Sequence, residues 1–186
     1  MTELLDHFLS RISAQGPISL ADYMSTCLLH PDLGYYTNRD PLGARGDFTT
    51  APEISQMFGE VIGLGLAQAW MDQGTPERFV MAELGPGRGS LMADILRATR
   101  RVPGFHAAAE VHLVEASPAL RQAQSARLAG YMPTWHDHCA DLPDDVPLYL
   151  VANEFFDALP IRQFQRAQDG WSEILVTAAE GRLTRA

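Results

Sequence analysis

The segment from Val80 to Leu91 constrains the fold of this chain more than any other stretch. An apolar run containing Glu83 ends in a turn with glycine at positions 85, 87 and 89, and a helical pattern begins at Ser90. Glycine permits backbone angles that other residues avoid and lets a ligand approach the main chain. A helix start adds unpaired N–H groups and a positive dipole end. The segment predicts a strand, a tight loop and a helix around a ligand that carries a carboxylate, a phosphate or a ribose.

The second half of the chain continues this alternation of strand and helix. Helices are expected at 90–101 and 117–130, the second with Leu120, Ala123 and Leu128 facing inward. The last expected strand is apolar throughout, which is typical of a central strand covered on both faces. The order predicts an α/β fold with an open, doubly wound, mostly parallel Rossmann-like sheet and a ligand at the carboxyl ends of its strands. The expected strands are 78–84, 110–115, 132–138 and 148–152.

The N-terminal part of the chain predicts a helical preface. Two short helices are expected at 2–16 and 19–29, the first capped by Thr2. A longer helix would span 50–74, with Thr50 and Glu53 as a capping box. Three glycines inside it each weaken a helix by about 1 kcal/mol relative to alanine, which predicts close packing against a neighbour. These glycines are Gly59, Gly63 and Gly65.

We expect two segments in one compact unit. Residues 1–74 would form the helical segment and a ligand-covering loop, and residues 75–186 would form the binding core. After Pro160, strands at 161–166 and 171–177 flank Asp169-Gly170, which predicts a C-terminal hairpin.

Composition and charge exclude several classes of function. All 14 basic residues are arginine, so a P-loop lysine or a Schiff-base lysine is excluded. The net charge of −9 argues against nucleic acid or an anionic membrane as partner. The sequence has no apolar run long enough to insert in a membrane and no basic N-terminal leader, and two unpaired cysteines fit a reducing compartment. We therefore expect a cytoplasmic protein.

The spacing of the glycine loop argues against a dinucleotide. That fingerprint requires glycine where the chain has Ser90, and an acidic residue about 20 positions on. Here the next acidic strand end is Glu115, further along the chain. The pattern Glu83-x-Gly85-x-Gly87-x-Gly89 followed by Glu115 instead resembles motif I and its follow-on in class I S-adenosylmethionine (SAM)-dependent methyltransferases. SAM suits such a loop, since its carboxylate could meet the loop N–H groups and its ribose hydroxyls could donate to Glu115.

Polar residues follow the expected strand 148–152. The segment Asn153-Glu154-Phe155-Phe156-Asp157 combines two carboxylates, an amide and two aromatic rings at a position where doubly wound enzymes present catalytic groups. The alternative is a short helix that begins at Asn153. A metal site in the segment 135–139 is disfavoured, because ligands so close along a strand cannot all face one ion.

Three blocks, at 46–60, 83–89 and 153–160, are more specific in combination than any one of them. Together with the turn at Gly34-Tyr35-Tyr36, the chain resembles the MidA-like family of SAM-dependent methyltransferases from about Leu20 onward. That family includes a mitochondrial complex I assembly factor that methylates an arginine of a core subunit. Its members are longer, so we expect the C-terminal part of the family fold to be absent here.

The resemblance implies a SAM-dependent methyltransferase that modifies an arginine of a protein, such as a complex I subunit. The alternatives are a non-catalytic SAM-binding assembly factor and an NAD-dependent oxidoreductase. Catalytic or substrate-bordering roles would belong to Glu154, Asp157 and Asp47. The unfinished sheet would leave an edge exposed, so homo-oligomers are also expected. The cofactor-binding residues would be Glu83, Gly85, Pro86, Gly87, Gly89, Glu115, Ala116 and Asn153.

Overall fold

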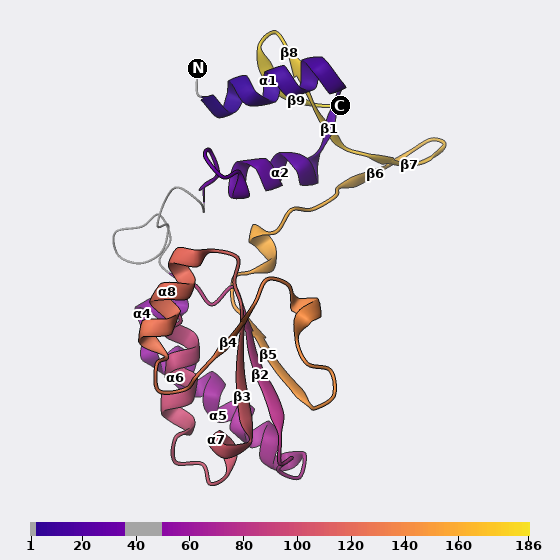
Figure 1. Ribbon diagram of the computed structural model, residues 1–186. Coiled ribbons are helices and arrows are strands. Elements are labelled where there is room, and N and C mark those ends of the chain that lie inside the picture. The colour runs from indigo at the N-terminus through magenta and orange to yellow at the C-terminus, as the bar shows by residue number, and fades with distance from the viewer. Residues whose placement is uncertain (1–2, 36–49) are drawn as a thin grey trace. The chain divides into compact units, whose positions relative to one another are not determined.

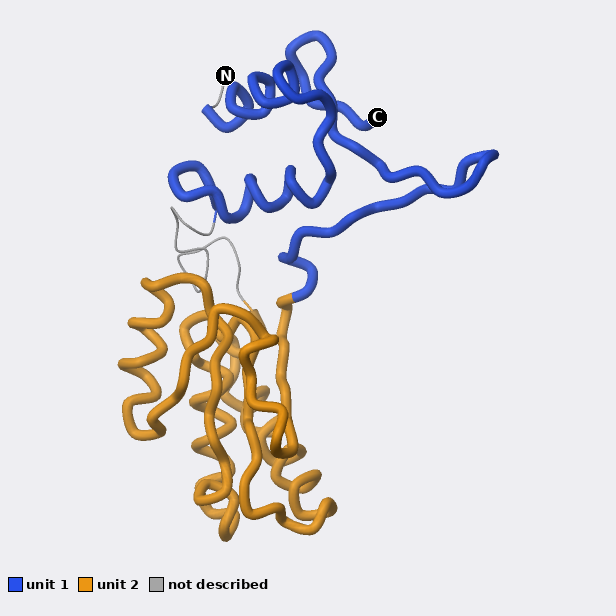
Figure 2. Tube along the Cα trace, turned by 45° about the vertical axis from the view of Figure 1, so that its right-hand side comes forward, with its two compact units in different colours: residues 1–40, 156–186 blue, residues 41–155 orange. Residues whose placement is uncertain are grey.

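The computed structural model describes residues 3–35 and 50–186 (Figure 1). The chain divides into two compact units, unit 1 with residues 1–40 and 156–186 and unit 2 with residues 41–155 (Figure 2). These units do not coincide with the expected segments 1–74 and 75–186. The long helix that begins at Gln56 packs within unit 2, and the last strands of the chain pair with an N-terminal strand in unit 1.

A four-stranded parallel sheet forms the centre of unit 2. The strand order is β4-β3-β2-β5, and the register aligns Leu84 with both Val114 and Ala152. This confirms the parallel α/β sheet expected from the sequence. The chain moves outward from β2 to β4 and returns on the other side of β2 as β5, so strand order reverses where such folds bind ligands. The bounds are β2 Phe79–Leu84, β3 Ala109–Val114, β4 Thr134–His136 and β5 Leu148–Ala152.

Helices cover one face of this sheet. In Figure 1, α6 (Ser90–Thr99) and α8 (Pro118–Arg127) lie on the same side of the strands, and α5 (Gln56–Asp72) packs against α6. Alternate strand residues point toward the helices because successive side chains of a strand face opposite ways. Shorter helices of unit 2 include α7 (Phe105–Ala108), before β3, and the 3-10 helix η1 (Cys139–Asp141), after β4. The shared core includes Phe79, Met81, Val111, Leu113, Tyr149, Leu91, Met92, Ile95 and Leu96.

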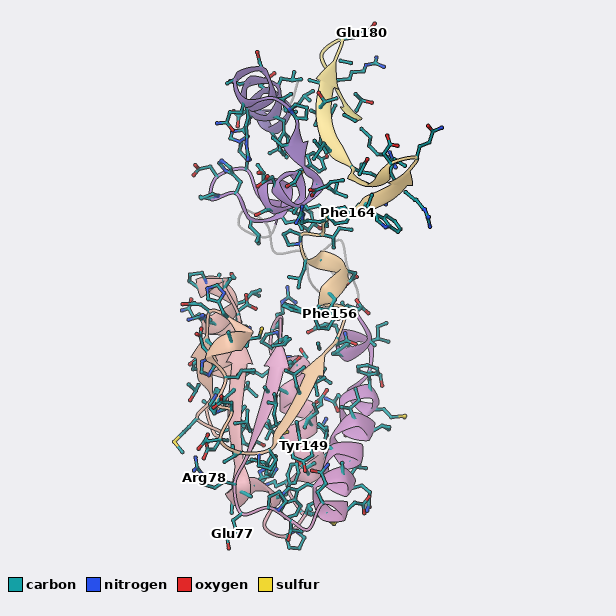
Figure 3. All side chains as sticks on the ribbon, turned by 90° about the vertical axis from the view of Figure 1, so that its right-hand side faces the viewer. Glu77, Arg78, Tyr149, Phe156, Phe164 and Glu180 are labelled. Atoms are coloured by element: carbon teal, nitrogen blue, oxygen red, sulfur yellow. The ribbon has the colours of Figure 1, made fainter. Side chains whose placement is uncertain are left out.

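Strand β5 is an edge strand of the sheet among the described residues, with β2 as its neighbour. Tyr149, labelled in Figure 3, is buried in the helix-side core, and its hydroxyl donates a hydrogen bond to Oε1 of Gln73 at 2.8 Å. Leu148 and Leu150 face the other way and are 46% and 40% exposed. The expectation that both faces of this strand are covered is therefore wrong for these two leucines.

Close packing between α5 and α6 explains two of the three helix glycines. A Cβ at Gly59 would lie 2.6 Å from Cβ of Asp94, and one at Gly63 would lie 2.9 Å from Cα of Ile95. Gly65 has no neighbour within 4 Å of such a Cβ among the described residues. The packing prediction is confirmed for Gly59 and Gly63 and is wrong for Gly65.

The single helix expected at 50–74 is two helices. α4 (Ala51–Ile54) ends at Ser55, whose extended backbone starts α5 and whose Oγ accepts a hydrogen bond from N–H of Met57. The Thr50 side chain makes no capping hydrogen bond, and Oε1 of Glu53 instead accepts one from Oγ of Ser90. The predicted capping box is therefore wrong, because Glu53 is engaged by a distant residue.

Unit 1 brings together both ends of the described chain. α1 (Glu3–Gln15) and α2 (Leu20–Leu29) follow the expected bounds, and Oγ of Ser19 caps α2 by accepting from N–H of Asp22. The predicted cap at Thr2 lies outside the described residues. The core of this unit contains Phe8, Ile12, Ile18 and Val176. The sheet of unit 1 runs antiparallel in the order β1 (Ile18–Ser19), β8 (Leu175–Ala179) and β9 (Arg182–Arg185).

The expected hairpin around Asp169-Gly170 is confirmed as β6 (Phe164–Ala167) and β7 (Gly170–Glu173). The strand expected at 171–177 is divided, because β7 pairs with β6 whereas β8 pairs with β1 and β9. The 3-10 helix η2 (Phe156–Ala158) precedes this hairpin in the chain. No helix in the described part of the chain is long and apolar enough to cross a membrane.

Candidate functional site

The loop between β2 and α6 has the backbone that its glycines predict. Gly85, Gly87 and Gly89 all have positive φ, at 59°, 54° and 76°. The N–H of Gly89 donates to the carbonyl of Pro86 at 2.8 Å, which closes a tight turn, and Gly89 then caps α6. The N–H of Gly85 donates to the carbonyl of Val114 at 3.0 Å and ties the loop to β3. The predicted strand, loop and helix are confirmed.

A buried carboxyl group lies beneath this loop. Glu83 is 3% exposed, and burial raises its pKa to about 8, against the effect of a hydrogen bond from N–H of Met92 in the first turn of α6. Its Oε2 atom is buried and has no hydrogen-bond partner among the described residues. An unsatisfied buried polar atom is costly, so this carboxyl group is suited to form a hydrogen bond with a bound ligand.

Glu115 follows β3, and its carboxylate is held in place from two sides. Its Oε1 accepts from N–H of Ser117 at 2.8 Å, and its Oε2 accepts from the amide of Gln124 at 3.2 Å. Burial raises the pKa of Glu115, whereas these bonds, the N–H of Ala116 and the charge of Arg121 act in the opposite direction. Each carboxylate oxygen keeps a second lone pair, so the positioned Glu115 side chain can accept hydrogen bonds from ligand hydroxyls.

Gln124 on α8 also belongs to this site, although the sequence did not predict it. The expected inward face of α8 contained Ala123, but Ala123 is exposed and Gln124 is 0% exposed. The Gln124 side chain contacts the glycine loop through the carbonyl of Gly87, at 2.8 Å. A glutamine on a surface helix gives no sequence signal, because helical periodicity assigns apolar residues to the buried face.

The end of β5 also reaches the glycine loop. A Cβ at Gly85 would lie 2.5 Å from Cδ2 of Phe155, so only glycine fits against this ring. Glu154 is exposed and has φ of 49°, which is uncommon for a residue with a side chain. Asn153 is partly buried at the end of the strand. The alternative helix start at Asn153 is wrong, because η2 begins at Phe156.

Two of the predicted residues lie outside the described part of unit 2. Asp157 is exposed in unit 1, and Asp47 lies outside the described residues, so their roles stay predictions. In the segment 135–139, Nε1 of Trp135 donates to Oε1 of Gln124 and Asp137 pairs with Arg121. Across the described ranges there is no group of three or more residues suited to hold a metal ion.

A polar pocket borders the start of α6 and was also missed from sequence. Its lining includes Glu53, Ser90, Asp94 and Arg127. Oγ of Ser90 donates to Glu53 and accepts from the guanidinium of Arg127, which joins α4, α6 and α8. Ser90, the residue that breaks the dinucleotide pattern, is thus a structural link at this position.

Three features define the class of this protein: the parallel sheet, the glycine loop after β2, where the strand order reverses, and the acidic residue after β3. The class is that of the Rossmann-like binders of an adenosine-containing cofactor. A family model whose description reads "Putative S-adenosyl-L-methionine-dependent methyltransferase" matches residues 61–185. The chain therefore belongs to this methyltransferase family.

Known proteins similar to this chain agree with that assignment. The zebrafish (Danio rerio) protein arginine methyltransferase NDUFAF7, mitochondrial, is 45% identical over an alignment of length 195 that covers 93% of this chain and 46% of the relative. The human protein of the same name is 38% identical over an alignment of length 200 that covers 95% of this chain and 45% of the relative. A crystal structure of a Burkholderia thailandensis protein bound to S-adenosyl-homocysteine has a TM-score of 0.78 and 32% identity, covering 98% of this chain and 49% of that one. The chain thus spans about half the length of these relatives.

The names of these relatives correct one expectation. The zebrafish, human and Drosophila melanogaster proteins are all named mitochondrial. The cytoplasmic location expected from the sequence is therefore wrong, because relatives of similar sequence are named for another compartment.

Proposed function

We propose that this chain binds S-adenosyl-L-methionine at the carboxyl ends of β2 and β3 and takes part in methyl transfer to an arginine of a protein substrate. The observation that carries the proposal is the pairing of the positive-φ glycine loop with the oriented carboxylate of Glu115. The family match, the named relatives and the neighbour with bound S-adenosyl-homocysteine support it.

The residues of the site fit the chemical groups of this cofactor. The free Oε2 of Glu83 suits the amino group, the glycine loop and the start of α6 suit the carboxylate, and Glu115 suits the ribose hydroxyls. The carbonyl of Pro86 accepts the hydrogen bond that closes the glycine turn, the N–H of Ala116 contacts Glu115, and Asn153 directly follows β5. When bound, the cofactor supplies an electrophilic methyl group, while the protein supplies orientation and electrostatics.

The acceptor side of the proposal rests on carboxylates. A guanidinium is best positioned by planar contacts to carboxylates and must lose a proton around the transfer. Glu154 is the first candidate because its backbone is held in an unfavourable conformation at the end of β5. Asp157 and Asp47 are further candidates. We extend the proposal to a subunit of respiratory complex I as the protein substrate and to a role in complex I assembly, on the family resemblance.

Calorimetric titration with S-adenosyl-homocysteine tests the cofactor site. We expect micromolar binding to the wild-type chain and a loss of about 1–3 kcal/mol in Glu115→Ala, which leaves buried ligand hydroxyls without an acceptor. Glu110→Ala is the matched control, since Glu110 stands at the opposite end of β3 and pairs with Arg78. A folded wild-type chain that binds neither cofactor nor product would refute the proposal.

Self-association is the last part of the proposal. The β5 edge carries exposed Leu148 and Leu150, and one side of α5 exposes Met57, Val61 and Leu64. Contiguous apolar surface of this kind favours association. In sedimentation experiments the wild type should form oligomers. Val61→Glu should be monomeric, because it places a charge on the apolar side of α5. A monomeric wild type at all concentrations would contradict this part alone.

A further inference from the structure

Three polar bonds fix a buried amide at the centre of the site. The Nε2 atom of Gln124 lies 2.8 Å from the carbonyl oxygen of Gly87 and 3.2 Å from Oε2 of Glu115. Its Oε1 atom lies 2.8 Å from Nε1 of Trp135. The three contacts therefore involve the glycine loop, the end of β3 and β4, which are distant in sequence and adjacent in the sheet.

The chemistry of these partners leaves only one orientation for the amide. A carbonyl and a carboxylate can only accept hydrogen bonds, and the indole N–H can only donate. Both N–H bonds of Gln124 are therefore directed at the loop and the carboxylate, and its carbonyl is occupied by Trp135. Gln124 is also 0% exposed, so water cannot replace any of these bonds.

We infer that Gln124 is a positioning residue for the cofactor, which sets the distance and orientation of the Glu115 carboxylate relative to the glycine loop. This inference rests on the proposed binding of S-adenosyl-L-methionine. One amide bonds to both structures that would hold the cofactor, so a shift of either one is resisted by the other. A buried donor of this kind also favours the ionised form of Glu115, which is the form that accepts two ribose hydroxyls.

The test replaces the amide with an apolar side chain of similar size. Gln124→Met keeps the volume and removes all three hydrogen bonds, and we expect roughly a tenfold loss of affinity for S-adenosyl-homocysteine by calorimetry. Gln122→Met is the matched control, because Gln122 is an exposed glutamine on the same helix. Should Gln124→Met fail to fold, Trp135→Phe removes the indole N–H together with the five-membered ring that carries it, and we expect a smaller loss of roughly twofold to fivefold.

A pH profile separates positioning from general support of the fold. The groups that face the Glu115 carboxylate are the N–H bonds of Ala116 and Ser117, the Gln124 amide and the Arg121 guanidinium from α8. Loss of the Gln124 donor should raise the pH at which binding weakens on acidification. A role in fold stability alone would lower thermal stability without a shift of this midpoint.

The outcomes are distinguishable. Loss of affinity in Gln124→Met with an upward shift of the midpoint supports the inference. Wild-type binding with unchanged affinity and midpoint in Gln124→Met overturns it and leaves the cofactor proposal intact. If Gln124→Met does not fold, an unchanged affinity in Trp135→Phe overturns it likewise. A folded wild type that does not bind S-adenosyl-homocysteine overturns both.

Discussion

The aromatic ring of Phe155 occupies the space where a side chain at residue 85 would be, with Cδ2 at 2.5 Å from a Cβ built on Gly85. This contact joins the end of β5 to the loop that follows β2, the two strands between which the strand order reverses. The position of Glu154, the first candidate to contact the methyl acceptor, is therefore linked to that of the glycine loop, since Phe155 is its immediate neighbour.

Gly85→Ala should lower both the thermal stability of the chain and its affinity for S-adenosyl-homocysteine. The substitution adds the backbone cost of a positive φ, about 1–2 kcal/mol, and displaces the Phe155 ring. Gly74→Ala is the control, because Gly74 has φ of 85° and no neighbour within 4 Å among the described residues. Equal losses of affinity in both variants would show that the ring contact has no role.

Gly63→Ala should destabilise unit 2 by about 1–3 kcal/mol in urea unfolding. The added Cβ would lie 2.9 Å from Cα and 3.0 Å from the carbonyl oxygen of Ile95. These are backbone atoms, so a change of side-chain rotamer cannot relieve the contact. Gly65→Ala, two residues on in the same helix, should instead stabilise the chain by up to about 1 kcal/mol. Equal changes in the free energy of unfolding of the two variants would contradict the close packing of α5 against α6 at Gly63.

Stability should decrease as pH rises from about 4.5 to about 8, because of Glu83. Its pKa of about 8 in the folded chain stands above the usual 4.5, so the folded state binds the proton more tightly than the unfolded state does. The stability that this proton contributes is complete below the pKa of Glu83 in the unfolded chain, and it is lost as the pH rises through the pKa of Glu83 in the folded chain. In urea unfolding at a series of pH values, Glu83→Gln should remove this part of the slope. Glu77→Gln, at an exposed glutamate, should retain it, and identical slopes in all three proteins would contradict the prediction.

Glu154→Gly should stabilise the chain by about 1 kcal/mol and abolish methyl transfer. Glycine removes the cost of φ at 49° together with the carboxylate that we propose contacts the acceptor. Glu154→Gln keeps the backbone cost and should reduce transfer at least about 100-fold with S-adenosyl-homocysteine binding unchanged. Transfer would be followed as labelled methyl on arginine in a protein acceptor.

Glu180 provides the control for that experiment. It is an exposed glutamate with φ of 51° at the turn between β8 and β9. Glu180→Gly should give a similar gain of stability without a change in transfer. Intact transfer in Glu154→Gln would remove Glu154 from the mechanism.

Local interactions explain why the sequence predicted much of this fold. The strand and glycine loop at 80–89, the helix starts at Ser19 and Ser117 and the hairpin turn at Asp169-Gly170 each depend on residues a few positions apart. Positive φ at the loop glycines follows from the absence of a Cβ, and a strand flanked by turns is recognisable wherever it packs. These features required no knowledge of distant contacts.

The tertiary structure alone decided the features that depend on distant partners. Gln124 is buried because the glycine loop, Glu115 and Trp135 surround it. Glu53 does not form the expected capping box with Thr50, because its carboxylate accepts a hydrogen bond from Ser90. Likewise β1 is only two residues long and exists because β8 pairs with it. A polar side chain far along the chain gives the sequence no local signal, since its partner is set by how strands and helices pack.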